Sequence, residues 1–220
     1  MTKCGELKFD ITMPSHNAEQ KKIIRTQCRE LRNKLTQAEQ TAAAVSVVEH
    51  FYRLVHENKP KSVGVFLAND GELSPHKLVE YCWLNDISTY LPVIDTDNRG
   101  YLRFYEYSQN TPLKNNAFGI PEPDIQFARN IQHLSLDWVL MPLVAFTNEG
   151  QRLGMGGGFY DRTFAMIKNE QNDTIRLIGL AHECQCIPSL PVESWDIDMH
   201  AMLTPERYIQ LKVPNNYTKD

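Results

Sequence analysis

Glycine and arginine gather in one short segment of this 220-residue chain. Five of its 11 glycines lie between residues 150 and 158, and they are Gly150, Gly154, Gly156, Gly157 and Gly158. Because glycine has no Cβ, such a loop can turn its backbone N–H groups toward an anion and approach it closely. Arg152 and Arg162 flank the glycines and add positive charge. The segment predicts a phosphate-binding loop; the alternative is a tight strand-to-helix turn that binds nothing.

The loop matches neither of the two common nucleotide-binding motifs. The pattern GxxxxGK[ST] is missing, and the stretch GMGGGF has Phe159 where GxGxxG needs its last glycine. A helix pattern runs from about Phe159 to Asn169, so its positive dipole end would point at the same anion.

A row of basic side chains follows the first predicted helix, which runs from Asn17 to about Leu35. At 100° per residue, one face of this helix holds Lys21, Arg25, Cys28 and Arg32, with Arg29 close beside them. The row borders the apolar stripe of the same helix, which is the side expected to be buried. Spacing alone leaves two interpretations open, a solvated surface or a strip that leans over a cleft.

Three carboxylates stand where a ligand could reach them. Glu72 follows a turn just beyond the carboxyl end of a predicted strand, where open α/β sheets bind ligands. Asp161 lies in the first turn after the glycines, and Asp196 lies in a loop near the carboxyl end. Asp161 and Asp196 could share one Mg²⁺ through oxygen ligands. Taken singly, each of the three can also be a helix cap or a surface charge.

Two weaker groups remain. His182, Cys184 and Cys186 could bind a metal, but no fourth ligand stands at zinc spacing, so a structural role is favoured. Three aromatic residues could stack on a flat ligand or belong to the core: Phe118, Tyr160 and Trp195.

The elements that position these residues alternate between strand and helix. The predicted strands are 62–68, 88–94, 101–107, 138–146 and 176–181, and a capping box at Thr36 and Glu39 opens a helix that ends near Asn58. This alternation predicts a mostly parallel sheet with helices on both faces. We expect one domain over residues 17–220, after a poorly ordered lead-in at residues 1–16.

Composition limits the possible partners. The chain is 42% hydrophobic and 23% charged with a net charge of −4, which supports a sizeable core and gives no general electrostatic footprint for nucleic acid. It has no apolar run of about 18 residues, and its amino end has no apolar stretch like that of a signal peptide. We therefore expect a monomeric cytoplasmic protein that contacts neither nucleic acid nor membrane.

The segment MPLVAFTNEGQRLGMGGGFYDR (141–162) resembles the signature of the 5-formyltetrahydrofolate cyclo-ligases, also called 5,10-methenyltetrahydrofolate synthetases. Three further stretches agree in order, KKIIR (21–25), FLANDGELSP (66–75) and AFGIPEP (117–123), and the likeness covers about residues 18–205. It implies a three-layer α/β/α fold and an enzyme that uses ATP and Mg²⁺. Such an enzyme converts 5-formyltetrahydrofolate to 5,10-methenyltetrahydrofolate, ADP and phosphate.

The resemblance also implies roles for particular residues. The ATP-binding residues would be Lys21, Lys22, Arg25, Arg152, Leu153, Gly154, Met155, Gly156, Gly157, Gly158, Phe159 and Tyr160. The folate-binding residues would be Leu67, Glu72, Phe118 and Tyr160. Asp161 and Asp196 would hold Mg²⁺, and Arg152 would also act in catalysis. The chain departs from the family pattern at Gly157, where some members have lysine, and at Trp195 and His200.

The implied chemistry needs no nucleophilic side chain. If the formyl oxygen attacks the γ-phosphorus of ATP, the formyl carbon becomes electrophilic, nitrogen 10 closes the ring and phosphate leaves. The protein must then hold two ligands in line and screen phosphate charge. Two alternatives keep the same loop: another small-molecule kinase or ligase, and a non-catalytic module that binds folate or nucleotide.

Overall fold

The computed structural model describes residues 16–116, 119–169 and 175–211. The predicted lead-in therefore lies outside the described residues except for His16, and the predicted folate contact Phe118 lies outside them as well.

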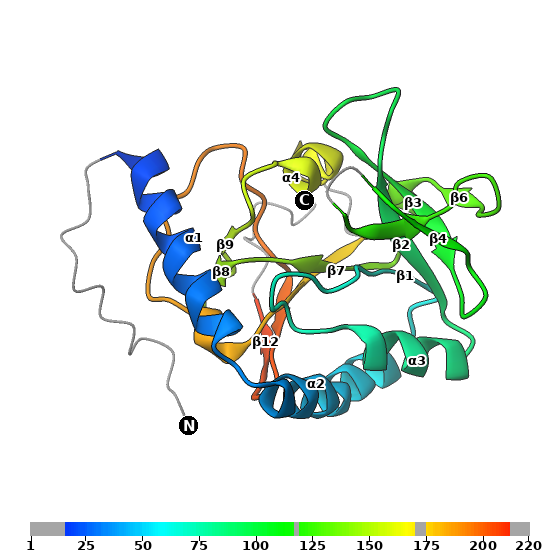
Figure 1. Cartoon of the computed structure of the whole chain (residues 1–220), viewed down its shortest axis with the longest axis horizontal. Helices are drawn as coiled ribbons and strands as arrows, with labels where there is room; N and C mark the ends of the chain where they lie inside the picture. The colour runs from blue at the N-terminus through cyan, green and yellow to red at the C-terminus, as the bar shows by residue number, and fades with distance from the viewer. Residues whose placement is uncertain (1–15, 117–118, 170–174, 212–220) are drawn as a thin grey trace, which may run out of the picture.

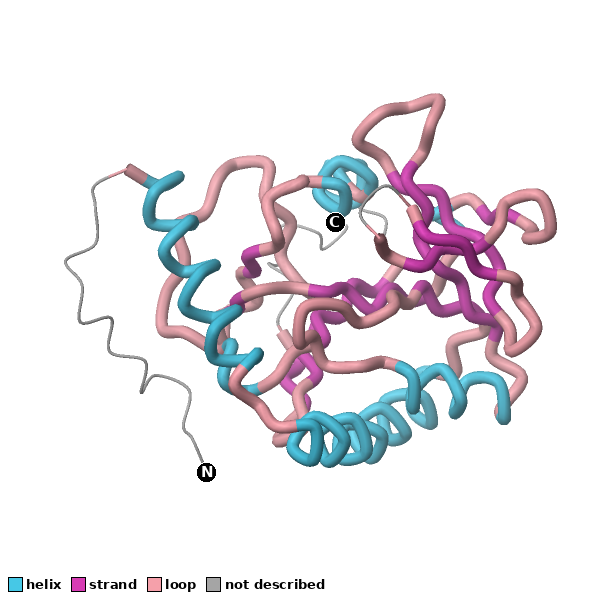
Figure 2. Tube along the Cα trace, viewed as in Figure 1, coloured by secondary structure: helices cyan, strands magenta, loops and turns pink. Residues whose placement is uncertain are grey.

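Helices and strands alternate up to residue 94 and again after residue 159, whereas the described residues between 95 and 153 form strands and one 3₁₀ turn (Figures 1 and 2). The helices are α1 (Asn17–Asn33), α2 (Gln37–Asn58), α3 (His76–Leu84), α4 (Phe159–Thr163) and α5 (Ala165–Asn169), with 3₁₀ turns η1 (His133–Ser135) and η2 (Glu183–Gln185). The strands of the main sheet are β1 (Ser62–Gly64), β2 (Ser88–Ile94), β3 (Leu102–Tyr107), β6 (Asn130–Ile131), β7 (Trp138–Pro142), β10 (Arg176–Leu180), β11 (Ala201–Leu203) and β12 (Tyr208–Gln210). Two small ribbons are formed by β4 (Leu113–Asn115) with β5 (Pro121–Pro123), and by β8 (Ala145–Phe146) with β9 (Arg152–Leu153).

The main sheet has eight strands in the order β12-β11-β10-β7-β1-β2-β3-β6. Its central ladders, from β11 to β2, are parallel, and β12, β3 and β6 join antiparallel at the two edges. The mostly parallel α/β sheet predicted from the alternation of elements is confirmed.

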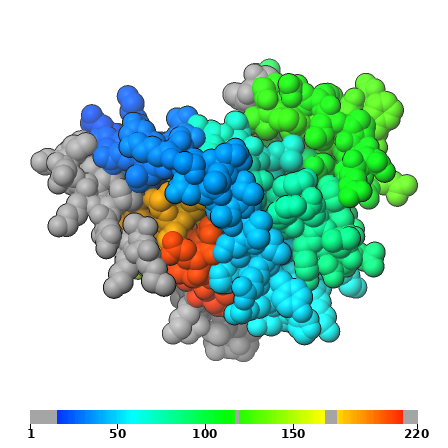
Figure 3. Space-filling view, turned by 60° about the horizontal axis from the view of Figure 1, so that its bottom comes forward, coloured from blue at the N-terminus to red at the C-terminus, as the bar shows by residue number. Residues whose placement is uncertain are grey.

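Alternate side chains of the strands enter two apolar clusters on opposite faces of the sheet. In β7, Trp138 and Leu140 pack on the side covered by α2 and α3, whereas Val139 and Met141 pack on the side of Phe164, between α4 and α5. Figure 1 shows the two helical layers below and above the sheet, and Figure 3 shows α2 between α3 and the carboxyl-terminal strands. The fold is therefore the three-layer α/β/α arrangement that was expected.

Helix α1 lies at the carboxyl ends of the central strands rather than over a face of the sheet. Its Ile24 and Cys28 are buried in a third cluster with Val144, Ala145 and Leu153, so the helix packs on the small ribbon β8–β9 (Figure 1). This packing places the basic row of α1 beside the segment that follows β9.

Three predicted elements differ from the observed ones. The strand expected at 62–68 ends at Gly64, and the chain then leaves the sheet, so that Phe66 and Leu67 line a cavity. The strand expected at 138–146 stops at Pro142, and the Leu143 carbonyl accepts hydrogen bonds from side chains instead of from a ladder.

The helix expected over 159–169 is two short helices, α4 and α5, which meet at Phe164. The Thr163 hydroxyl donates to the Phe159 carbonyl (2.8 Å) and accepts the Leu102 N–H of β3 (2.9 Å). Such back-bonding by threonine bends helices. The dipole of a five-residue helix is small, so anion binding would depend on the loop itself.

The capping box of α2 is present as predicted. The Thr36 hydroxyl accepts the Glu39 N–H, and the Glu39 carboxylate accepts the Thr36 N–H (2.8 Å). We predict that Thr36→Ala lowers the free energy of unfolding by about 1 kcal/mol in chemical denaturation. The control is Thr41→Ala, because the Thr41 hydroxyl bonds only to Gln37 within the same helix and caps no terminal N–H group. Equal destabilisation by both substitutions would contradict the capping role.

Candidate functional site

A cavity of about 1100 Å³ opens at the carboxyl end of β7. Its walls come from α1, the segment after β1, the ends of β2 and β7, the loop between β9 and α4, and the loop before β11. Ligands of open α/β sheets bind at this end of the strands. Predicted site residues that line it are Lys21, Arg25, Leu67, Glu72, Arg152, Leu153, Gly154, Met155, Gly156, Gly157, Gly158, Phe159, Tyr160, Asp161 and Asp196.

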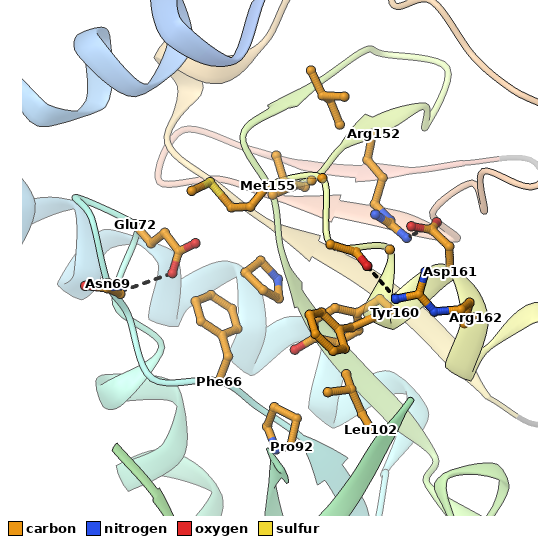
Figure 4. Close-up of a pocket in the computed structure, with 18 of the residues that line it drawn as sticks. Phe66, Asn69, Glu72, Pro92, Leu102, Arg152, Met155, Tyr160, Asp161 and Arg162 are labelled. Atoms are coloured by element: carbon orange, nitrogen blue, oxygen red, sulfur yellow. Dashed lines mark hydrogen bonds and ion pairs between the residues drawn. The ribbon is translucent and has the colours of Figure 1, made fainter. Parts of the chain in front are cut away.

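The glycine-rich loop has a backbone that other residues rarely adopt. Gly156 and Gly158 have φ angles of 101° and 65°, in the left-handed region that favours glycine. A Cβ on Gly158 would also lie 2.7 Å from Nη1 of Arg162. The Arg162 guanidinium in turn donates to the Gly157 carbonyl (dashed line at Arg162 in Figure 4). It also donates to the Gly100 carbonyl (2.8 Å). The two glycines and the hydrogen bonds of Arg162 thus stabilise one conformation of the loop.

The basic row of α1 faces this loop. Nε of Arg25 donates to the Gly154 carbonyl (2.8 Å), and the Arg25 guanidinium lies against Gly156. Burial lowers the pKa of Arg25, and Asp196 opposes the shift. Lys21 also lines the cavity, whereas Lys22 is exposed and is not among the lining residues. Of the two interpretations open at the sequence level, the structure supports the strip over a cleft.

Arg152 is buried at the loop's start, with an exposed fraction of 8%. Its Nη2 lies 2.5 Å from Oδ1 of Asp161. Its Nε is buried without a hydrogen-bond partner in the described structure. A buried donor of this kind costs free energy unless an acceptor is supplied. Arg152 therefore offers an N–H group at the cavity wall that a bound anion can satisfy.

Both predicted metal ligands are paired with basic side chains. Asp196 accepts a bond from Nζ of Lys21 (2.9 Å) and from the Glu193 N–H, and Asp161 accepts from Arg152 and, at 3.3 Å, from the Ile197 N–H. Residues 16–116, 119–169 and 175–211 contain no group of three metal-ligating side chains. Two carboxylates still fit Mg²⁺, because this ion usually keeps several waters and takes further oxygens from phosphate.

The opposite wall of the cavity is more apolar and carries the Glu72 carboxylate, beside those of Asp70 and Glu122. Glu72 accepts the Asn69 N–H (3.1 Å), and its side chain is 14% exposed. Burial raises the pKa of Glu72, and the Asn69 N–H and Arg32 oppose this. Burial likewise raises the pKa of Tyr160, and Glu72 adds to the shift. Figure 4 shows Glu72 and Phe66 on one side of the cavity and Tyr160 on the other.

The His182 group is structural in its contacts. His182 is buried and pairs through Nε2 with the Gln40 side chain (2.9 Å), and burial lowers its pKa to about 4. Burial raises the pKa of the Cys184 thiol to about 11. These contacts favour the structural role over the metal site.

Sequence reasoning missed part of the cavity wall. Pro92 and Ile94 line it, yet they belong to an ordinary apolar stretch with no motif. Phe66 also lines it, and the family-like stretch 66–75 that it opens indicates no role for it. The sequence indicates Arg32 only as a member of the basic row. Neither spacing nor residue type indicates which apolar side chains face a cavity rather than the core.

Known proteins resemble this chain over most of its length. Residues 17–205 match the profile of the 5-formyltetrahydrofolate cyclo-ligase family. The chain belongs to this family. The "5-formyltetrahydrofolate cyclo-ligase" of Haemophilus influenzae is 38% identical over 187 residues, which cover 85% of this chain and 98% of the relative. The protein of the same name from Escherichia coli K12 is 44% identical over 147 residues, or 66% of this chain and 79% of the relative.

Solved structures show the same fold. The 5,10-methenyltetrahydrofolate synthetase of Aquifex aeolicus superposes with a TM-score of 0.75 at 25% identity, over 90% of this chain and 96% of its own. A synthetase from Mycoplasma pneumoniae gives 0.66 at 18% identity, over 84% and 98%, and supports the fold alone. This cyclo-ligase-family chain is therefore an enzyme of the ligase class with the fold of its relatives.

The left-handed backbone of the loop gives a direct test. Gly156→Ala forces a side chain into that region at a cost of about 1–2 kcal/mol, so we predict about tenfold weaker ATP binding by calorimetry. Gly154→Ala is the matched control: its backbone lies outside the left-handed region, and its Cβ would meet its nearest neighbour, Nη1 of Arg152, at 3.6 Å. The loop's role would be contradicted if both variants bound ATP like the parent.

Proposed function

We propose that this chain catalyses the ATP-dependent closure of 5-formyltetrahydrofolate to 5,10-methenyltetrahydrofolate, with release of ADP and phosphate. The observation that carries the proposal is one cavity with two unlike walls. One wall has a glycine loop with basic side chains, suited to phosphate, and the other is mostly apolar and carries the Glu72 carboxylate, which is suited to a pterin and only 14% exposed. Family membership supports the same reaction.

On the phosphate side, backbone N–H groups of residues 153–158 and three cations would hold the triphosphate. Lys21 and Arg25 approach from α1, and Arg152 approaches from the start of the loop. The formyl oxygen would attack the γ-phosphorus, and the three cations would stabilise the charge on the transferring group. Arg152 is the proposed catalytic residue because its unpartnered Nε is already buried at the wall.

Asp161 and Asp196 would hold Mg²⁺ between the loop and the segment before β11. When bound, the ion would supply positive charge that offsets the negative charge of the phosphates. In the described structure Asp161 forms an ion pair with Arg152, and Asp196 forms one with Lys21. We propose that the two basic side chains turn to phosphate oxygens when the metal–nucleotide complex binds, so that every charge remains paired.

On the folate side, the Glu72 carboxylate would accept N–H bonds from the pterin ring. Leu67 and Tyr160 would pack on its flat faces. Because the Glu72 side chain is only 14% exposed, such a hydrogen bond would be stronger than one in bulk water. Ring closure by nitrogen 10 then needs only correct placement of the activated formyl group.

We propose one catalytic domain over residues 17–220, because segments from α1 to the loop before β11 all contribute to the cavity wall, and we propose that the protein acts as a monomer. We propose the cytoplasm as its location. No helix in the described parts of the chain has the length and apolarity of a membrane span.

The reaction itself is tested by the absorbance of the methenyl product. We expect product from 5-formyltetrahydrofolate only when both ATP and Mg²⁺ are present, with one phosphate released per product. Phosphate release without the methenyl product would overturn the proposal in favour of a kinase. Tight binding of both ligands without turnover would overturn it in favour of a binding module.

We predict that Arg152→Ala raises the KM for ATP about tenfold or more and the KM for folate much less, because it removes a charge-assisted hydrogen bond to phosphate. Arg103→Ala serves as the control, since Arg103 pairs with Asp95 and Asp97 outside the cavity. Steady-state kinetics with each substrate varied in turn give the comparison. Equal increases for both substrates would count against the assignment.

Glu72→Gln should act on the other substrate. We predict that it raises the KM for folate about tenfold and leaves the KM for ATP nearly unchanged, because the amide replaces an ionised acceptor. Burial raises the pKa of Glu72, so folate binding by the parent should weaken as the pH falls through that raised value. The variant should lack this dependence.

Glu80→Gln is the control for Glu72→Gln, because Glu80 forms a surface pair with Lys77. An unchanged KM for folate in Glu72→Gln would remove Glu72 from the site.

A further inference from the structure

Helix α1 contacts both walls of the cavity. Its first half carries Lys21 and Arg25 to the phosphate loop. The carboxyl-terminal part of α1 brings Arg29, Arg32 and Asn33 to the turn at residues 69–72, which follows β1. At 1.5 Å per residue, these side chains lie about 10–15 Å further along the helix than Lys21 and Arg25. One rigid element therefore connects the two proposed substrate sites.

Arg32 is the side chain at the far end of this connection, and it has no exposed surface. Its Nε donates to the Asp70 carbonyl (2.7 Å), its Nη1 to the Leu143 carbonyl (3.1 Å) and its Nη2 to the Asp70 carboxylate (2.9 Å). A buried guanidinium is tolerated when its N–H groups are paired in this way. These bonds join α1, the end of β7 and the turn after β1.

The turn that Arg32 holds is otherwise unfavourable. Asp70 has a φ angle of 51°, a left-handed conformation for a residue with a side chain. Its carboxylate also accepts from Arg29 (2.6 Å) and from Asn33 (3.1 Å). Three side chains of α1 thus fix Asp70 in a strained conformation.

Glu72 lies two residues beyond Asp70, and Oε1 of Glu72 lies 3.9 Å from Nη2 of Arg32. The same guanidinium therefore holds the turn and faces the carboxylate that points into the cavity. We propose that Arg32, acting through Asp70, is the positioning residue that places the Glu72 carboxylate for the folate. This inference rests on the proposed function of the cavity, and it gives Arg32 a task separate from that of Lys21 and Arg25.

Charged and titratable groups face Glu72 from several elements. Arg32 comes from α1, Asp70 from the same turn, and Tyr160 from α4. His182 lies near Arg32, but its lowered pKa keeps it neutral. Arg32 lowers the pKa of Glu72, while Asp70 raises it. Loss of the Arg32 charge therefore raises the pKa of Glu72. As the pH falls, folate binding should then begin to weaken at a higher pH than in the parent, and this fall in affinity is the acid limb of folate binding.

The test compares Arg32→Met, Arg32→Lys and Asp70→Asn with a surface control, Arg53→Met, whose arginine is 66% exposed and pairs with Glu49. We expect Arg32→Met to raise the KM for 5-formyltetrahydrofolate about tenfold and the KM for ATP less than about threefold. Its acid limb should shift to higher pH. Calorimetric titration with 5-formyltetrahydrofolate alone should show the same loss of affinity.

The lysine and asparagine variants separate charge from geometry. Arg32→Lys keeps the charge but cannot make all three bonds, so it should keep the parent's pH profile and still bind folate more weakly. Asp70→Asn keeps the shape of the turn and removes the ionised partner of Arg32, so it should weaken folate binding as well. These two variants decide the question if Arg32→Met does not fold.

Folate affinity like that of Arg53→Met in both Asp70→Asn and the Arg32 variants would overturn the inference. Equal increases in both KM values, with an unchanged pH profile and a lowered Tm, would also overturn it, because they indicate a structural role alone. If the parent enzyme forms no methenyl product, the proposed function fails instead, and the two failures are distinguishable.

Discussion

The packing of α1 against the ribbon β8–β9 is the interaction on which the site depends. Ile24 and Cys28 enter an apolar cluster with Leu153, the residue that leads into the glycine loop. Arg25 then donates to the Gly154 carbonyl at 2.8 Å. The hydrophobic effect thus brings two segments more than 100 residues apart into contact, and a hydrogen bond fixes their register. Without that contact the cations of α1 would face solvent.

A cluster of cations around a cavity is stable only if carboxylates balance it. In this enzyme Asp196 pairs with Lys21, and Asp161 pairs with Arg152. Arg152 is nearly buried, so its partner must be close. The charges needed for a phosphate ligand are therefore held ready without a large self-repulsion. Exchange of these partners on ligand binding would explain how a preformed site accepts both a metal and a triphosphate.

The parts of the fold that local sequence determines were predicted well. The strand at 88–94 and the capping box at Thr36 agree with the structure because each depends on neighbouring residues. The break at Phe164 was not predictable, since it involves a hydrogen bond that the Thr163 hydroxyl accepts from the Leu102 N–H of β3, about 60 residues earlier. Pro142 ends β7, and its residue type is a signal for this end because proline has no N–H to donate to a strand ladder. The apolar run 138–146 that contains it nevertheless predicts one longer strand.

The site itself was only half predictable. Residue spacing predicts which face of α1 carries the basic row. It does not predict what that face contacts, because the contact is the glycine loop, more than 100 residues away in the sequence. Resemblance to the family extended the prediction to Lys22, which the structure leaves exposed and away from the cavity wall. It gave no role to Arg32, because a buried arginine and a solvated one have the same spacing. Only the three-dimensional contacts with Asp70 and Leu143 separate the two.

Amide hydrogen exchange can show whether α1 and the glycine loop bind the triphosphate. With a non-hydrolysable ATP analogue and Mg²⁺, we expect slower exchange in residues 153–158 and little change in the turn at 69–72. With 5-formyltetrahydrofolate alone, we expect slower exchange in that turn and little change in the loop. Nucleotide-dependent protection that leaves residues 153–158 unaffected would contradict the claim that α1 and the glycine loop together bind the triphosphate.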